Sequence, residues 1–206
     1  MSQPDKFKKL YKKMDATCKT RFHYSRRMKL HSAFSTWIIV YISLVLILTS
    51  LLQAYGIGTN IESKYFSLIQ IFSSITVLVY SLMNDKNDYS SLSEKMYSCA
   101  SQLNALKREA DPHTAEGKLE KYAEISKKYQ EILDLYETAS INDFRADYWR
   151  SQLEMPEDYD IKGDSRKKLH AKIWFRYALN FVQYPLIVLI YVFLLYWLWI
   201  GEKSPV

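Results

Sequence analysis

Three long runs of uncharged residues divide the chain. They extend from Ser32 to Ile61, from Tyr65 to Asn84 and from Tyr177 to Gly201, and contain 30, 20 and 25 residues. A bilayer core about 30 Å thick requires about 20 apolar residues in a helix that rises about 1.5 Å per residue. The pattern therefore predicts an all-α integral membrane protein, with a transmembrane hairpin over residues 32–84 and a third C-terminal transmembrane helix over 171–201.

Short breaks in this pattern predict where the helices turn or bend. The segment from Tyr55 to Asn60 contains two glycines and an asparagine, which favour a chain reversal between the first two spans. We expect a kink over 84–89, where the chain becomes polar. Gln183 and Pro185 predict a local kink in the third span, because proline removes a helical hydrogen bond.

Residues 1–31 form a basic arm with the period of one helical face. The arm predicts an amphipathic helix, for which two interpretations stay open. It packs on the soluble part of the same protein, or it lies on the membrane surface with its basic face toward lipid headgroups. We expect Arg21, Arg26 and Arg27 to fix the arm at the membrane or in a helical bundle. The periodic apolar face comprises Phe7, Tyr11, Met14, Cys18, Phe22 and Ser25.

The polar region over 85–170 predicts a cytoplasmic helical bundle. One amphipathic helix should end near Ala110, where Asp111-Pro112 is a stop signal, and a second should cover about 114–138. We interpret their apolar stripes as core, not as a ligand site. From Ser140 to Lys168 the pattern is less regular and includes a charged and aromatic cluster. The periodic or clustered residues are Leu92, Met96, Cys99, Leu103, Leu106, Leu119, Tyr122, Tyr129, Ile132, Leu133, Tyr136, Asp143, Phe144, Arg145, Asp147, Tyr148 and Trp149.

Charge predicts the orientation in the membrane. Residues 1–31 carry ten Lys/Arg against two Asp, whereas 85–176 carry sixteen Lys/Arg against eighteen Asp/Glu. Positive charge beside a span favours the cytoplasmic side, so the N-terminus and the central region should be cytoplasmic and the tail over 202–206 external. Contact of the arm with anionic lipid is favoured over direct nucleic acid binding.

The sequence contains no pattern typical of catalysis or metal binding. Neither CxxC nor HExxH occurs, and the four histidines are scattered. Cys18 and Cys99 fall on the side expected to be cytoplasmic, where thiols stay reduced. We therefore expect no cofactor, no metal and no enzymatic activity.

Small polar residues recur along one face of each of the first two spans. Such a stripe has two interpretations: it lets transmembrane helices pack closely, or it lines a water-filled path in an oligomer. Neither span contains Asp, Glu, Lys or Arg, so a charged selectivity ring is not expected. The candidates are Thr36, Ser43 and Ser50 in the first span and Ser67, Gln70, Ser74 and Ser81 in the second.

The order of several short motifs resembles the SLATT domain family, two-span membrane proteins of bacterial conflict systems. The resemblance covers roughly residues 15 to 150. The chain departs from the family pattern at Thr138-Ala139, where Asn-His is expected. The motifs are Arg21-Phe22 ahead of Arg26-Arg27, then Cys99 and Leu103-Asn104-Ala105-Leu106, then Tyr136-Glu137 and Asp143-Phe144.

The resemblance implies a membrane effector of anti-phage defence. Such proteins are thought to oligomerise and form pores or disrupt the bacterial inner membrane, causing cell death or dormancy when triggered. It also implies a partner from the same defence system, namely a reverse transcriptase or a nucleotide-generating or nucleotide-sensing protein. The alternative is a membrane-anchored adaptor whose cytoplasmic helical bundle recruits a partner.

Overall fold

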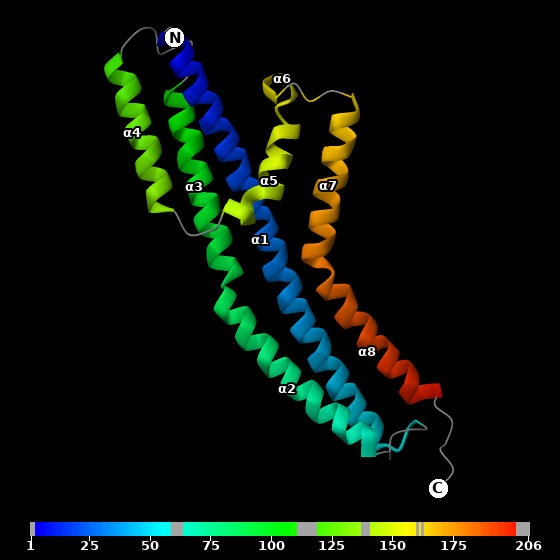
Figure 1. Cartoon of the computed structure of the whole chain (residues 1–206). Coiled ribbons are helices and arrows are strands. Elements are labelled where there is room, and N and C mark those ends of the chain that lie inside the picture. The colour runs from blue at the N-terminus through cyan, green and yellow to red at the C-terminus, as the bar shows by residue number, and fades with distance from the viewer. Residues whose placement is uncertain are drawn as a thin grey trace. The chain divides into compact units, whose positions relative to one another are not determined.

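The protein is built from α-helices joined by short connections. The computed structural model describes residues 3–58, 64–110, 119–136, 141–159, 161 and 163–200, and these contain no β-strand. Figure 1 shows the helices along the chain. They are α1 (Gln3–Ala54), α2 (Lys64–Asn87), α3 (Tyr89–Glu109), α4 (Leu119–Leu135), α5 (Ile141–Leu153), α6 (Pro156–Tyr159), α7 (Gly163–Phe181) and α8 (Gln183–Ile200).

These helices form two compact units. Unit 1 comprises Met1–Lys29 and Ser90–Leu179, and unit 2 comprises Leu30–Tyr89 and Asn180–Val206. The membrane-spanning candidates α2 and α8 belong to unit 2, together with the second half of α1. Unit 1 contains the basic arm and the polar region that follows the hairpin.

Helix α1 runs without a break through both the basic arm and the first apolar run. The sequence from Asp5 to Tyr55 contains neither glycine nor proline, so nothing interrupts the helical hydrogen bonds. Gly56, with φ of 67°, ends the helix, and its N–H donates to Gln53 O while the N–H of Ile57 donates to Leu52 O. This pair of bonds is a Schellman cap, which confirms the predicted turn as far as the described residues extend.

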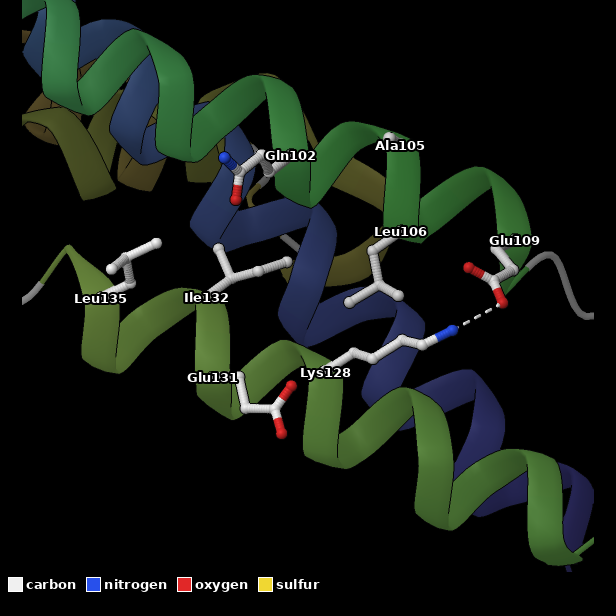
Figure 2. A pocket seen from close by; sticks show the side chains of 8 residues that line it. All are labelled: Gln102, Ala105, Leu106, Glu109, Lys128, Glu131, Ile132 and Leu135. Carbon is white, nitrogen blue, oxygen red and sulfur yellow. Dashed lines mark hydrogen bonds and ion pairs between the residues drawn. The ribbon is translucent and has the colours of Figure 1, made fainter.

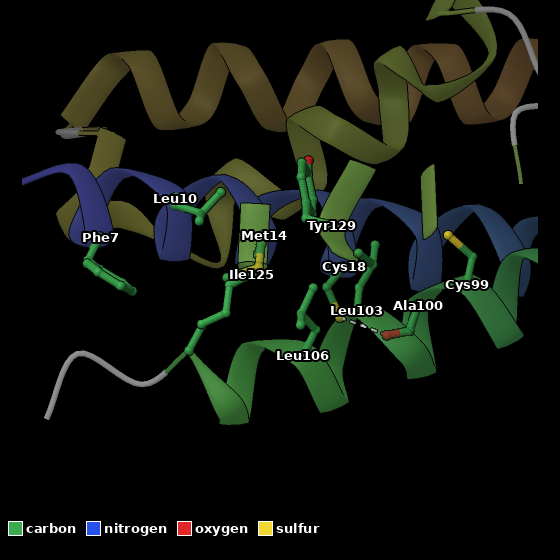
Figure 3. Packing of buried hydrophobic residues seen from close by; sticks show 11 residues of the cluster. Phe7, Leu10, Met14, Cys18, Cys99, Ala100, Leu103, Leu106, Ile125 and Tyr129 are labelled. Atoms are coloured by element: carbon green, nitrogen blue, oxygen red, sulfur yellow. Dashed lines mark hydrogen bonds between the residues drawn. The ribbon is translucent and has the colours of Figure 1, made fainter. Parts of the chain in front are cut away.

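The core of unit 1 is built by α1, α3 and α4 (Figure 3). The predicted faces of these three helices supply it, which confirms the core interpretation of their stripes. The apolar face of the arm is thus buried within the protein. The buried members are Phe7, Leu10, Met14 and Cys18 from α1, Cys99, Ala100, Leu103, Leu106 and Ala110 from α3 and its end, and Ile125 and Tyr129 from α4.

The core of unit 2 is formed mainly by α1 and α8. Ile38, Ile42 and Val45 of α1 pack with Tyr184 and Tyr191 of α8, and part of α2 packs against this cluster. Outside the core, apolar side chains point outward, as expected where lipid is the solvent. Among the described residues, two helices are long and apolar enough to cross a membrane, and a third crossing exists if the broken pair α7 and α8 counts as one. The chain is an all-α membrane protein.

Some local predictions are confirmed and others need correction. The expected kink over 84–89 occurs at Asp88, whose φ of 38° separates α2 from α3. The kink predicted at Gln183 and Pro185 is confirmed as a break, because α7 ends at Phe181 and α8 begins at Gln183, with Pro185 in its first turn where proline is tolerated. The third apolar run is therefore divided between two helices and is not the single helix expected over 171–201. The region expected to be irregular contains α5. The stop signal at Asp111-Pro112 lies outside the described residues.

Candidate functional site

The polar positions of the second span form an exposed stripe on α2. Ser67, Ser74 and Ser81, here named the hydroxyl stripe, are all exposed in the described chain. Residues seven apart on a helix drift by only about 20°, so the three side chains share one face. Their fourteen-residue separation corresponds to roughly 21 Å along the helix, most of a bilayer core about 30 Å thick.

A local hydrogen bond makes the central hydroxyl of the stripe tolerable in an apolar solvent. Ser74 Oγ donates to the backbone oxygen of Gln70, 3.0 Å away, as serine often does one turn back in a helix. Gln70 is half-buried, and its Nε2 donates to Ser50 Oγ at 3.4 Å, which links α2 to α1. The Ser74 hydroxyl can therefore face lipid, water or another protein surface with its donor paired.

The candidates of the first span follow the same rule. Thr36 and Ser50 are exposed and Ser43 is half-buried. Each hydroxyl donates to the backbone four residues earlier, over 3.0 Å for Thr36 and 2.8 Å for both Ser43 and Ser50. Only Ser50 is brought to the second span, through Gln70.

Different small residues are buried in unit 2. Ser35 and Thr49 of α1 and Ser73 of α2 are buried, with exposed fractions of 2%, 2% and 7%. Ser35, Thr49 and Ser73 each lie one position before a candidate, at Thr36, Ser50 and Ser74. Small hydroxylated residues allow close approach of transmembrane helices, so these positions fit packing within one chain. The hydroxyl stripe, by contrast, lies on the exposed surface of α2.

A buried polar cluster in unit 2 was not found from the sequence. His31 Nδ1 lies 2.9 Å from the Tyr184 hydroxyl, and Ser35 Oγ lies 3.2 Å from the same hydroxyl. The His31 ring stacks on Phe181 with centroids 4.2 Å apart. A small cavity of about 50 Å³ beside Ser35 is lined by further polar side chains, including Gln183. This size suits one or two waters among polar groups.

Unit 1 contains a buried ion pair that joins α1 to α5. Asp147 has no exposed surface, and its Oδ2 accepts from Arg27 Nη2 at 2.8 Å and from Arg27 Nε at 3.1 Å. Tyr177 of α7 donates its hydroxyl to Asp147 Oδ1 at 2.8 Å. Arg27 therefore lies inside the helical bundle. This is one of the two locations predicted for the basic residues of the arm; the other was the membrane surface.

The other two predicted arginines have different environments. Arg21 is half-buried, with its guanidinium carbon 4.1 Å from the ring centroid of Phe144, and its Nη1 lies 3.3 Å from the sulfur of Met96. Arg26 is exposed. The structure thus brings Arg21 and Arg27 to α5 and leaves Arg26 at the surface.

Burial and ion pairing shift the pKa values of two ionisable groups in unit 1, His23 and Asp15. Burial lowers the pKa of His23 despite Glu154, whose Oε1 lies 3.0 Å from the ring Nε2. That contact is close, but neither ring nitrogen has a well-aligned hydrogen bond within the described chain. Burial alone would raise the pKa of Asp15, but hydrogen bonds from Lys107 and Lys19 outweigh it and lower that pKa.

The two thiols are buried and unreactive in character. Burial raises the pKa of Cys18 to about 11 and also raises the pKa of Cys99. Cys18 Sγ donates to Ala100 O at 3.2 Å, and neither cysteine is in a disulfide. Within the described ranges, no group of three or more His, Cys, Asp or Glu gathers as metal ligands would.

One surface pocket lies between α3 and α4 (Figure 2). Its volume is about 420 Å³, and its lining combines aliphatic side chains such as Leu106 and Ile132 with charged ones. Lys128 pairs with Glu109 at 3.3 Å and with Glu124 at 2.8 Å. The Lys128 ammonium is therefore already paired with two carboxylates and is not available to bind an anionic ligand.

Comparison with known families identifies a match over nearly the whole chain. The model of the SMODS and SLOG-associating 2TM effector domain family 5 matches residues 3–199, nearly the whole chain. Among curated proteins and solved structures, none matches the chain.

Proposed function

The chain belongs to the SMODS and SLOG-associating 2TM effector family, and on that premise we propose that it oligomerises in the bacterial inner membrane and opens a leak path. The family places it among defence-related membrane effectors. In this proposal the arm and the central region are cytoplasmic, and the protein acts without catalysis. Loss of membrane integrity then causes cell death or dormancy.

The observation that carries the proposal is the exposed hydroxyl stripe of α2. In the described chain only Phe66 and Ser73 of this helix are buried. In the most apolar 18-residue stretch of each span, 11% of the residues are buried in the span that begins with α2, against 28% in α1. Helix α2 therefore has much surface left for another copy or for lipid. A straight row of hydroxyl groups on that surface favours a polar environment along most of the membrane thickness.

Several copies would place their stripes around a common axis. Hydroxyl groups that face one another there can be hydrated, whereas the apolar residues on the opposite side of α2 contact lipid. Because the spans carry no charged side chain, the path would select weakly among ions. A partner that binds the open arrangement more tightly would shift the population toward it.

The trigger in this proposal is a component of the same defence system. The sequence resemblance indicates a reverse transcriptase or a nucleotide-generating or nucleotide-sensing protein. Unit 1 is the part of the chain that would receive it, because its surface is polar and its core is held by its own packing and ion pairs.

The adaptor alternative rests on that same independence of unit 1. In an adaptor, the spans only anchor the bundle, so unrelated spans should replace them without loss of function. In a leak-forming effector, the same replacement should abolish toxicity. Toxicity of a chimera with unrelated spans would therefore favour the adaptor.

A leak assay on the stripe tests the proposal. The protein is produced in bacteria from a tightly controlled promoter, and membrane potential is followed with a dye. A triple variant with Ser67→Leu, Ser74→Leu and Ser81→Leu should insert but fail to depolarise the cells. Fractionation of the membranes verifies insertion of each protein.

Thr76→Leu is the matched control. Thr76 lies nine residues after Ser67, which places it about 180° around the helix. It is also exposed and bonds its own backbone, donating to Phe72 O at 2.8 Å. Depolarisation by the parent and by Thr76→Leu, but not by the triple variant, supports the proposal. Equal depolarisation by all three contradicts it, and no depolarisation by an inserted parent favours the adaptor.

A further inference from the structure

A second pocket in unit 1 lies between α1 and α5. Its volume is about 450 Å³, within the usual range of small-molecule sites. We name it the arginine–aromatic pocket. Its lining includes Thr17, Arg21, Phe144, Arg145, Tyr148 and Trp149.

Among the described residues that line this pocket, two are cationic and none is acidic. Within the described chain, neither Arg21 nor Arg145 forms an ion pair. Arg27, six residues after Arg21 on the same helix, does form an ion pair, with the Asp147 carboxylate 2.8 Å away. Arg21 is half-buried, so its guanidinium is partly desolvated, whereas Arg145 is exposed at the rim of the pocket. An anionic ligand here would offset the desolvation of Arg21 and gain a second charge-assisted contact from Arg145.

Arg21 is held in place before any ligand binds. Its guanidinium stacks over Phe144 at 4.1 Å, and one nitrogen contacts Met96. Stacking restricts the side chain, so less freedom is lost when it binds an anion. The planar fork of arginine matches phosphate oxygens in pairs, which a lysine ammonium cannot do.

The rest of the lining suits a flat ring. Tyr148 is exposed and Trp149 is half-buried, and both present aromatic surface. The Thr17 hydroxyl is already bonded to Lys13 O at 2.8 Å and to the Tyr129 hydroxyl at 3.0 Å. The anion would therefore be recognised by the arginines, and an attached ring by stacking, which tolerates any nucleobase.

We propose that the arginine–aromatic pocket binds a nucleoside phosphate, with its phosphate at Arg21 and Arg145 and its base against Tyr148 and Trp149. The pocket between α3 and α4 is of similar size but has no unmatched cation, because Lys128 is paired twice. The proposal is separate from the leak path, and its test measures binding alone.

The test is calorimetric titration of the purified full chain in detergent. The probes are AMP, adenosine and inorganic phosphate, which separate the contributions of ring and anion. Arg145→Gln should weaken AMP binding at least about tenfold, the typical scale for one charge-assisted contact. The matched control is Arg26→Gln, since Arg26 is exposed on α1, removes the same charge and does not line the pocket.

A second variant separates the ring contact from the charge. Trp149→Ala should weaken AMP but leave the affinity for phosphate unchanged, whereas Arg145→Gln should weaken both. Circular dichroism verifies that each variant is folded. The absence of AMP binding by the parent overturns the proposal, and so does binding that Arg145→Gln and Arg26→Gln reduce equally. Displacement of AMP by phosphatidylglycerol in mixed micelles, lost in Arg145→Gln, assigns the site to a lipid phosphate and also overturns it.

Discussion

Units 1 and 2 handle polar groups in opposite ways, although one helix contributes to both. Unit 1 buries charges in pairs, such as Arg27 with Asp147, and Asp15 pairs there with Lys107 at 2.7 Å. In the described part of unit 2 no Asp, Glu, Lys or Arg is buried, and serine and threonine hydroxyl groups bond to their own helix, to Gln70 or to Tyr184. The polar groups of unit 1 thus suit an aqueous environment, and those of unit 2 suit a lipid environment.

A leucine side chain therefore has a different role in each unit. A large exposed leucine is normal on unit 2, where Leu78 is 62% exposed, because lipid is as apolar as a protein core. In unit 1, Leu103 is fully buried.

Asp147→Ala should destabilise unit 1 most. It removes the carboxylate that accepts two hydrogen bonds from the buried Arg27, and breaking a buried ion pair typically costs about 3 to 5 kcal/mol. Thermal unfolding in detergent, followed by circular dichroism, measures the loss. The control is Asp164→Ala, whose exposed pairing with Lys168 at 3.8 Å should contribute almost nothing. A loss no larger than that of the control would show that the buried pair is not stabilising.

Leu103→Ala should destabilise unit 1 by about 2 to 5 kcal/mol, because it leaves a cavity in a packed core. Leu78→Ala should have a much smaller effect, because lipid or detergent can fill the space next to α2. The two variants remove the same atoms and differ only in what surrounds the side chain, which is protein core at Leu103 and lipid or detergent at Leu78. Equal losses in the same unfolding experiment would contradict the assignment of Leu78 to a lipid-facing surface.

Tyr184→Phe should destabilise unit 2 by about 1 to 2 kcal/mol, because it removes the hydroxyl that bonds His31 and Ser35. Tyr196→Phe is the control, since Tyr196 is 59% exposed. Resistance of α8 to proteolysis in detergent reports the change. If the two variants are cleaved equally fast, the buried cluster does not stabilise α8.

His23 should make unit 1 less stable in mild acid. Its pKa is lowered by burial, so the unfolded chain binds the proton more readily than the folded one. The stability contributed by the neutral ring is present above about pH 6.5 and is lost as pH falls toward the lowered pKa. Glu154, Arg150 and Asp147 are the charged groups that act on the ring.

Unfolding temperatures measured between about pH 7.5 and pH 5.5 test this effect. His23→Gln should flatten the dependence, whereas His170→Gln, at an exposed position, should leave it unchanged. A parallel decrease in all three proteins would assign the pH dependence to other groups.

Much of the fold could be predicted from the sequence because period and apolar length are local properties. The face of the arm from Phe7 to Ser25 and the break after Asn84 are examples. Helix α5 was missed because its apolar positions are few and mixed with charges. The pairing of Arg27 with Asp147 joins residues 120 apart, and no local pattern encodes such a contact.

The candidate site shows a different limit. Small polar residues occur on more than one face of each span, and sequence alone does not say which face packs within the chain. The hydrophobic effect does not distinguish the faces either, because lipid and core are equally apolar. The structure resolves this by burying Ser35, Thr49 and Ser73 and exposing Ser67, Ser74 and Ser81. The His31 cluster depends on contacts with Tyr184, 153 residues away.

The water accessibility of α2 in active membranes directly tests whether the hydroxyl stripe lines a leak path. Single cysteines are placed at Ser67, Ser74 and Ser81 and at Thr76, then treated with a charged, membrane-impermeant thiol reagent. The native Cys18 and Cys99 can stay, because their burial and raised pKa keep them unreactive. We predict rapid labelling of the three stripe positions and slow labelling at Thr76. Equal labelling at all four positions, or none at the stripe, would contradict a water-filled path along this face.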